Sequence, residues 1–285
     1  MQNLLVLMST NSNTMNTLNT FSVFSSYTEE ILSRFSNAKI HSVFPNGFNL
    51  NFNGELVYIS YHQEGMLSAR GLAIDKQVFD SIHPYLEVGL LVRYRTDQLV
   101  FYTRPYVFTI KFIDRVSKNL KIEPTSFKDL KTMKLENRLE NMDLIENSGF
   151  SKNEALFDIL KDIRKTKEVN NDHIKELIGA GLGLTPSGDD FLQGLIFTEQ
   201  LFKNTPDLQK RTEKQLEERS TTDVSLSYYE ALFAGYGNEP LILLFEAVRE
   251  KEEPKIKKAL SFIQQYGETS GYDLLVGILT YLQIY

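Results

Sequence analysis

The residues best suited to chemistry lie in one short segment, which runs from Gly179 to Asp190. It holds three alternating glycines and ends in Ser-Gly-Asp-Asp. Glycine loops leave backbone N–H groups open to a ligand, and hydroxyl and carboxyl groups can donate and accept hydrogen bonds. The pattern predicts a binding loop that leads into a helix, with Ser187 as the N-cap residue.

Two known phosphate-binding loops do not fit this segment. Its glycine spacing places Leu184 where the third glycine of the dinucleotide fingerprint belongs, and residues 173–178 before it have a helical pattern, where that fingerprint needs a strand. A Walker A loop needs a Gly-Lys-Ser or Gly-Lys-Thr sequence, which does not follow.

A second copy of the helix start occurs 83 residues later in the chain. The shared pattern is S-G-x-D-x-L-x-G, so that Asp273 corresponds to Asp190 and Gly277 to Gly194. Glycine inside a helix costs about 1 kcal/mol relative to alanine, so its repetition favours two closely packed helices. Two adjacent helix N-termini, each with a partial positive charge, would make an anion site.

The carboxyl groups of this repeat have three possible roles. They could cap the helices, bind a cation, or accept hydrogen bonds from a substrate amide. A lone Asp-Asp pair is a weak sign of a metal site, so no metal is predicted. The candidate catalytic residues are Ser187, Asp189, Asp190 and Asp273.

The elements that would position these residues indicate an α+β fold. A β-rich domain, barrel-like or a meander, is expected over residues 1–116, then a charged helical linker over 117–150 and an α-helical domain over 151–285. Asn53-Gly54 between two β-favouring runs predicts a tight hairpin, and Ser151-x-x-Glu154 has the pattern of a capping box. Strands are expected at residues 39–44, 48–52, 55–61, 89–94, 99–103 and 106–112, and a short helix at 27–35.

Composition narrows the possible functions. The net charge is −6 without a basic stripe, which argues against a nucleic-acid partner, and there is no cysteine for disulfides or thiolate chemistry. The apolar run Met1–Met8 is too short for a membrane span and lacks the basic start of a signal peptide. We expect a buried strand or ordered segment there, no membrane partner and a cytoplasmic location. Structural roles are expected for the scattered histidines His41, His62, His83 and His173.

The segment from Gly181 to Gly194 resembles the signature of an uncharacterised-domain family that includes a subunit of oxamate carbamoyltransferase. Residues 267–277 are similar to the second block of that family, with Glu268 in place of its histidine and Tyr272 in place of its tryptophan. Residues 41–44 resemble its early strand.

The resemblance implies a subunit that interconverts a carbamoylated amide (oxalurate) plus phosphate with the free amide (oxamate) plus carbamoyl phosphate, in allantoin breakdown. It implies an oligomer with partner subunits similar to acyl-CoA synthetases. This transfer needs no cofactor. Phosphate or carbamoyl phosphate and the amide acid would bind to Gly181, Gly183, Thr185, Gly188, Glu268, Ser270 and Gly271.

The motif itself lacks a cation for such an anion. Arg70 or a partner subunit is expected to supply it. The alternative function is a non-catalytic subunit of an acyl-CoA-synthetase-like complex, which binds a metabolite or serves as a scaffold.

Overall fold

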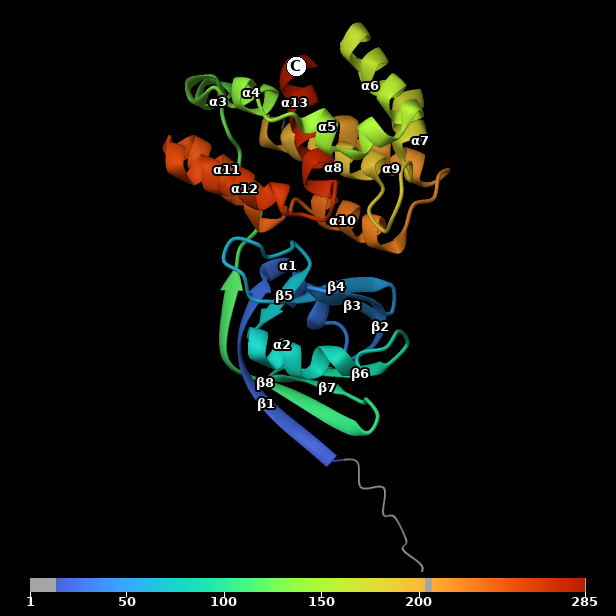
Figure 1. The fold of residues 1–285 in the computed structure, drawn as a ribbon, viewed down its shortest axis with the longest axis vertical. Coiled ribbons are helices and arrows are strands. Elements are labelled where there is room, and N and C mark those ends of the chain that lie inside the picture. Colours follow the sequence, from blue (N-terminus) through green and yellow to red (C-terminus); the bar gives the residue numbers. More distant parts are fainter. Residues whose placement is uncertain (1–13, 203–206, 285) are drawn as a thin grey trace, which may run out of the picture.

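The structure, a computed structural model, describes residues 14–202 and 207–284. The run Met1–Met8, for which a strand or ordered segment was expected, lies outside these residues. A β-barrel forms one layer of the molecule and helices form the other (Figure 1). The α+β class, with the β-rich part first, is therefore confirmed.

The barrel closes in the strand order β1-β5-β4-β3-β2-β6-β7-β8. The β1–β8 and β4–β5 pairs are parallel and the other pairs are antiparallel. The strands are β1 (Thr14–Ser25), β2 (Asn37–Phe44), β3 (Gly47–Phe52), β4 (Glu55–Tyr61), β5 (Gly71–Ile74), β6 (Leu91–Arg95), β7 (Gln98–Phe101) and β8 (Tyr106–Lys118). Three short helical segments accompany them: α1 (Ser26–Leu32), α2 (Lys76–Ile82) and η1 (His83–Tyr85).

The predicted hairpin between β3 and β4 is confirmed. Asn53 and Gly54 both have positive φ, 57° and 103°, as a type I′ turn requires. Side chains such as Phe48, Leu50 and Phe52 fill the barrel, and closure removes free sheet edges. The sequence did not predict β1, β5 or α2.

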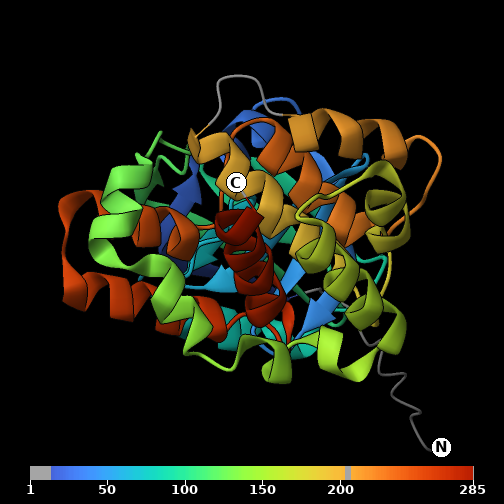
Figure 2. The same ribbon diagram turned by 90° about the horizontal axis from the view of Figure 1, so that it is seen from above.

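The helical layer contains eleven α-helices and one 3₁₀ turn within the described ranges. They are α3 (Phe127–Met133), α4 (Leu135–Glu140), α5 (Leu144–Asn147), η2 (Gly149–Lys152), α6 (Glu154–Thr166), α7 (Asn171–Leu177), α8 (Ser187–Phe202), α9 (Asp207–Leu216), α10 (Asp223–Phe233), α11 (Glu239–Glu250), α12 (Glu253–Gln264) and α13 (Ser270–Ile284). Seen from above, the other helices surround α13 (Figure 2). Helix α8 is buried along nearly its whole length.

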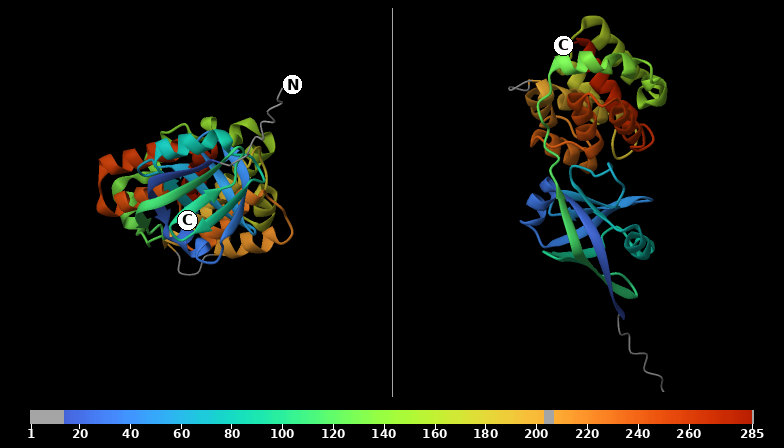
Figure 3. Two further views of the ribbon diagram at one scale, coloured as in Figure 1. Left: turned by 90° about the horizontal axis from the view of Figure 1, so that it is seen from below. Right: turned by 90° about the vertical axis from the view of Figure 1, so that its left-hand side faces the viewer.

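The charged stretch after the barrel belongs to the helical layer. The chain passes from β8 to α3 along one side of the molecule (Figure 3). Apolar residues of α3, α4, α5 and η2 then enter the helical core, among them Leu135, Leu139 and Phe150. The charged residues of this stretch lie mostly at the surface, which explains its polar composition.

Two of the predicted helix caps are wrong. Asn153 caps α6, whereas Ser151 lies in the 3₁₀ turn before it. At α8 the carbonyl of Pro186 accepts the N–H of Asp190, so Pro186 holds the cap position and Ser187 is the first helical residue. The Ser187 hydroxyl is thereby free to face α13.

A buried arginine joins the two layers. Arg70, with only 2 % of its side chain exposed, pairs with Glu55 of the barrel and Glu230 of α10. Its guanidinium also donates to the carbonyl oxygens of Leu56 and Ser227. Arg70 was a candidate cation for a bound anion, but these partners already occupy it.

Helices α8 and α13 touch through their backbones. A Cβ atom on Gly277 would lie 3.1 Å from the Cα atom of Gly194 and would overlap the carbonyl oxygen of Phe191. A Cβ atom on Gly194 would overlap the carbonyl oxygen of Leu274. The close packing predicted from the two helical glycines is confirmed.

Replacing either glycine with alanine should destabilise the protein. Alanine raises helix propensity by about 1 kcal/mol, but here its methyl group meets rigid backbone, and overpacking costs roughly 1–3 kcal/mol or more. Chemical denaturation of Gly194→Ala and Gly277→Ala measures the net effect. A gain of stability in both variants would show that the helices do not depend on this contact.

Candidate functional site

The α8–α13 contact brings the two Ser-Gly-x-Asp helix starts together. The hydroxyl of Ser270 lies beside Asp190 of the other helix, and the hydroxyl of Ser187 lies beside Asp273. The serine of each helix start therefore faces the aspartate of the other. Thr185, in the loop before α8, adds a contact of 2.9 Å between its hydroxyl oxygen and that of Ser270.

Asp273 supports the start of the 3₁₀ turn η2. Its Oδ1 atom accepts the N–H of Gly149 at 2.9 Å, and there is no room for a side chain between Gly149 and Ser187. Burial raises the pKa of Asp273 to about 6, although the Ser187 hydroxyl and the Gly149 N–H oppose this rise. The neutral carboxyl is thus favoured over a wider pH range than usual.

Asp189 holds the glycine-rich loop. Its carboxylate accepts the N–H of Gly179 at 3.1 Å and the hydroxyl of Tyr229 at 3.1 Å, together with the hydroxyl of Thr221. Burial raises the pKa of Asp189, and these hydrogen bonds oppose the rise. All three partners belong to the chain itself, so Asp189 has a positioning role.

The first-turn N–H groups of the two helices are largely used within the chain. Gly188 donates to Ala180, Asp189 and Asp190 both donate to Pro186, and Gly271 donates to Tyr266. The main contribution of the helix starts is therefore to position side chains, because few of their N–H groups are left for a ligand.

A cavity of about 210 Å³ lies where these helix starts meet the barrel, and we call it the interlayer cavity. Polar side chains from both layers converge there, including Asp190 and Ser270. The lining residues are Phe44, Asn49, Tyr58, Leu184, Thr185, Asp190, Gln193, Val224, Tyr228, Asn238, Tyr266, Gly267, Ser270 and Leu274.

Three buried polar atoms on the lining residues have no hydrogen-bond partner in the described chain. They are Oδ2 of Asp190, Nε2 of Gln193 and the hydroxyl of Tyr266. An unpaired buried polar group costs about 1–3 kcal/mol, so each of these atoms favours a bound partner. Burial raises the pKa of Asp190 well above its usual value, and the nearby Asp273 and Asp189 raise it further. The neutral carboxyl, which can both donate and accept, is favoured.

Three of the predicted site residues line the interlayer cavity, namely Thr185, Asp190 and Ser270. Ser187, Asp189 and Asp273 lie behind them as positioning residues. Of the glycines, Gly188 and Gly271 give room to the carbonyl groups of Leu177 and Ile263, and Gly181 and Gly183 adopt positive φ in the loop. Glu268 is exposed and pairs with Lys152.

Sequence reasoning missed several lining residues, above all Gln193 and Tyr266. Gln193 carries a detectable signal, because it is the polar member of an apolar run in α8, and the repeat has Val276 at the matching position. Tyr266 lies in the turn between α12 and α13, and nothing in its local sequence distinguishes it.

The histidines have mainly structural contacts. His41 meets Asp223 at 3.2 Å, His83 meets the carbonyl of Phe44 at 2.7 Å, and His173 completes the capping box of α7. Within the described ranges no group of three or more acidic residues or histidines is placed to hold a metal ion. None of the helices in these ranges is long and apolar enough to cross a membrane.

Comparison with known proteins supports the resemblance drawn from the motifs. The family described as oxamate carbamoyltransferase subunit AllH matches residues 177–282, which include the glycine-rich loop and both helix starts. The predicted family resemblance is thereby confirmed. No curated protein and no solved structure matches the chain.

The titration of Asp273 should be visible in protein stability. Its pKa rises from 3.8 to about 6 on folding, which corresponds to roughly 3 kcal/mol. A carboxyl with a raised folded-state pKa stabilises the protein below pH 4 relative to higher pH, and this advantage is lost as the pH rises to 6. Asp273→Asn, which stays neutral, should therefore gain stability relative to the wild type by up to that amount between pH 4 and 7. Denaturation curves at several pH values test this, and a pH-independent difference would contradict it.

Proposed function

We propose that the chain is a carbamoyltransferase subunit and that the interlayer cavity holds the amide end of its substrate. The family match, whose name is that of a carbamoyltransferase subunit, supports the first part. The second part rests on the convergence of the unpartnered atoms of Asp190, Gln193 and Tyr266 in one cavity. A small ligand that satisfies all three needs both a donor and an acceptor.

A primary amide or a ureido group has this combination. Its carbonyl oxygen would accept from the Nε2 atom of Gln193 and the hydroxyl of Tyr266, and its N–H would donate to Asp190. Thr185 and Ser270 would complete the polar wall. Oxamate, which the family name contains, and its carbamoylated form oxalurate both carry such a group, which supports the proposal.

In the proposed reaction a phosphate oxygen attacks the carbamoyl carbon of a carbamoylated amide. The bond between that carbon and the amide nitrogen breaks, and the nitrogen takes up a proton to leave as the free amide. Asp190, with its raised pKa, is the proposed donor of this proton and accepts it back in the reverse direction. Gln193 and Tyr266 would stabilise the negative charge that develops on the carbonyl oxygen.

The charge of the phosphate must be met outside the interlayer cavity. Neither lysine nor arginine occurs among the described residues that line it. Partner subunits, as the word subunit in the family name suggests, are one source of such a cation. A non-catalytic metabolite-binding subunit is the second candidate function, because the same cavity could bind an amide without transferring it.

Removing an unpartnered polar atom should affect stability and binding in opposite directions. Gln193→Met and Tyr266→Phe each delete a buried group that lacks a partner, so the free chain should be stabilised by about 1 kcal/mol. Oxamate binding should weaken by roughly tenfold or more, because a ligand hydrogen bond is lost. Melting curves and calorimetric titration with oxamate measure both effects. Tyr272→Phe, outside the cavity, is the control, and unchanged oxamate affinity in both test variants would refute the amide site.

Asp190→Asn separates the two candidate functions. Asparagine is similar in shape and binds an amide, but it cannot transfer a proton. In the assembled enzyme we expect carbamoyl transfer to fall by about a hundredfold or more, while oxamate still binds. Transfer at the wild-type rate would contradict a catalytic role for Asp190 and would favour the metabolite-binding function.

A further inference from the structure

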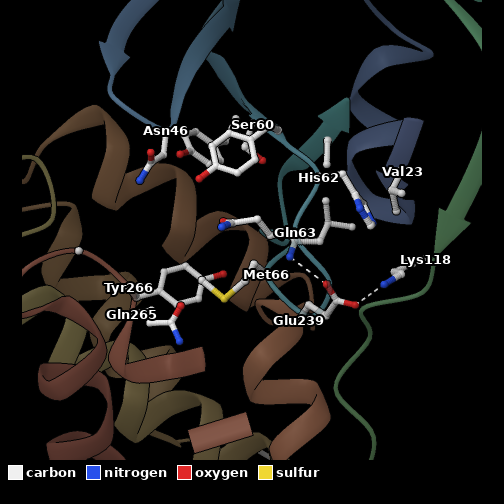
Figure 4. Close-up of a pocket in the computed structure, with 15 residues that line it drawn as sticks. Val23, Asn46, Ser60, His62, Gln63, Met66, Lys118, Glu239, Gln265 and Tyr266 are labelled. Atoms are coloured by element: carbon white, nitrogen blue, oxygen red, sulfur yellow. Dashed lines mark hydrogen bonds and ion pairs between the residues drawn. The ribbon is translucent and has the colours of Figure 1, made fainter. Parts of the chain in front are cut away.

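A second cavity, of about 150 Å³, adjoins the interlayer cavity (Figure 4). The two share Tyr58, Tyr266 and Gly267 as common walls. We call the second one the lysine cavity, because Lys118 lines it at the end of β8. A cavity in this position would suit a second group of the same ligand or a second reactant.

Lys118 is the one lysine or arginine among the described residues that line either cavity. Its ammonium group pairs with Oε1 of Glu239, whose side chain is only 6 % exposed. The other oxygen of Glu239 accepts the N–H of Leu67 at 2.9 Å. Glu239 thus holds Lys118 at the cavity wall, and both of its oxygens are in use. An ammonium group can donate three hydrogen bonds, so Lys118 can donate to a ligand in addition to Glu239.

Neutral donors line the same cavity as this ammonium group. They are the side chains of Asn46, Ser60 and Gln63 (Figure 4). His62 also lines the cavity and contacts Phe21 edge to face. Amide and hydroxyl groups that share a cavity with a cation are suited to an oxyanion.

The acidic residues nearby do not cancel this preference. Lys118 also borders a groove that contains Glu64, Glu246 and Glu250. Glu64 pairs with Lys258 and Glu250 with Lys255, and burial raises the pKa of Glu246, which favours its neutral form. Glu239 is the one carboxylate among the described residues of the lysine cavity, and it already accepts from Lys118.

We infer that the lysine cavity is a subsite for a small oxyanion, which Lys118 binds as the charged donor. The choice of oxyanion rests on the proposed function, and it is either the carboxylate of the amide acid or inorganic phosphate. The two cavities then bind different groups: the interlayer cavity binds the neutral amide, and the lysine cavity binds the oxyanion.

The test is calorimetric titration of the full chain with inorganic phosphate and, separately, with oxamate. The main variant combines Lys118→Met with Glu239→Gln, because this removes both charges and avoids a buried unpaired carboxylate. Glutamine at position 239 can still accept the N–H of Leu67. Lys111→Met, an exposed lysine on the same strand, is the matched control, and melting curves verify that each variant is folded.

We expect the double variant to bind the oxyanion roughly tenfold to a hundredfold more weakly, and the control to bind like the wild type. A loss for phosphate alone identifies the phosphate site, and a loss for oxamate alone identifies the carboxylate site. Unchanged affinity for both anions, or no binding of either anion to the wild type at millimolar concentration, overturns the inference.

The outcome also separates this inference from the proposed function. If Gln193→Met loses oxamate while the double variant binds both anions normally, the amide site stands without this subsite. If the double variant loses phosphate while Gln193→Met keeps oxamate, the oxyanion subsite stands and the amide site falls.

Discussion

The backbone contact between Gly194 and Gly277 fixes the geometry on which the rest of the site depends. Because no side chain separates the two helices there, their first turns lie close enough for Ser187 to reach Asp273 and for Ser270 to reach Asp190. Larger residues at the crossing would push the helix starts apart. The contact between Thr185, in the loop before α8, and Ser270, at the start of α13, would then be lost, and with it part of the lining of the interlayer cavity.

Burying three carboxyl groups at one place is unfavourable, and the fold offsets this in different ways. The N-terminal ends of α8 and α13 favour negative charge in their first turns. Asp189 accepts hydrogen bonds from the N–H of Gly179 and the hydroxyl of Tyr229, and Oδ1 of Asp273 accepts the N–H of Gly149. The Oδ2 atoms of Asp190 and Asp273 are both buried without a hydrogen-bond partner, but of the three aspartates Asp190 alone lines the interlayer cavity. That position, rather than the presence of an acidic cluster, distinguishes a binding residue from two positioning residues.

The barrel contributes residues to the wall opposite the helix crossing, and the two layers together line the site. Tyr58 and Asn49 come from strands far from the repeat in sequence, and Arg70 ties those strands to α10. Closure of the barrel keeps these residues in fixed register. Burial between the two layers raises the pKa of Asp190.

Local sequence signals predicted what depends on local geometry. The Asn53-Gly54 turn, the helical periods and the two glycine contacts follow from residue type and spacing alone. Gln193 and Tyr266 could not be predicted in this way, because their role comes from which atoms lack a partner after folding. The cap at α8 was wrong for a related reason. A serine that can cap its own helix instead faces a second helix, and only the three-dimensional arrangement decides between these roles.

The two adjoining cavities would also influence each other through charge. An oxyanion beside Lys118 would place negative charge in the cavity that adjoins the one lined by Asp190, and charges act over longer distances in a protein interior than in water. The charge would raise the pKa of Asp190 further and keep the proton on its carboxyl group. Asp190 would then hold its proton while the oxyanion is bound, and it would donate that proton only as negative charge develops on the departing amide nitrogen. In this arrangement, binding of the anion in the lysine cavity would keep Asp190 protonated in the interlayer cavity. The binding of the amide and of the negative charge in separate cavities would thus favour the transfer step.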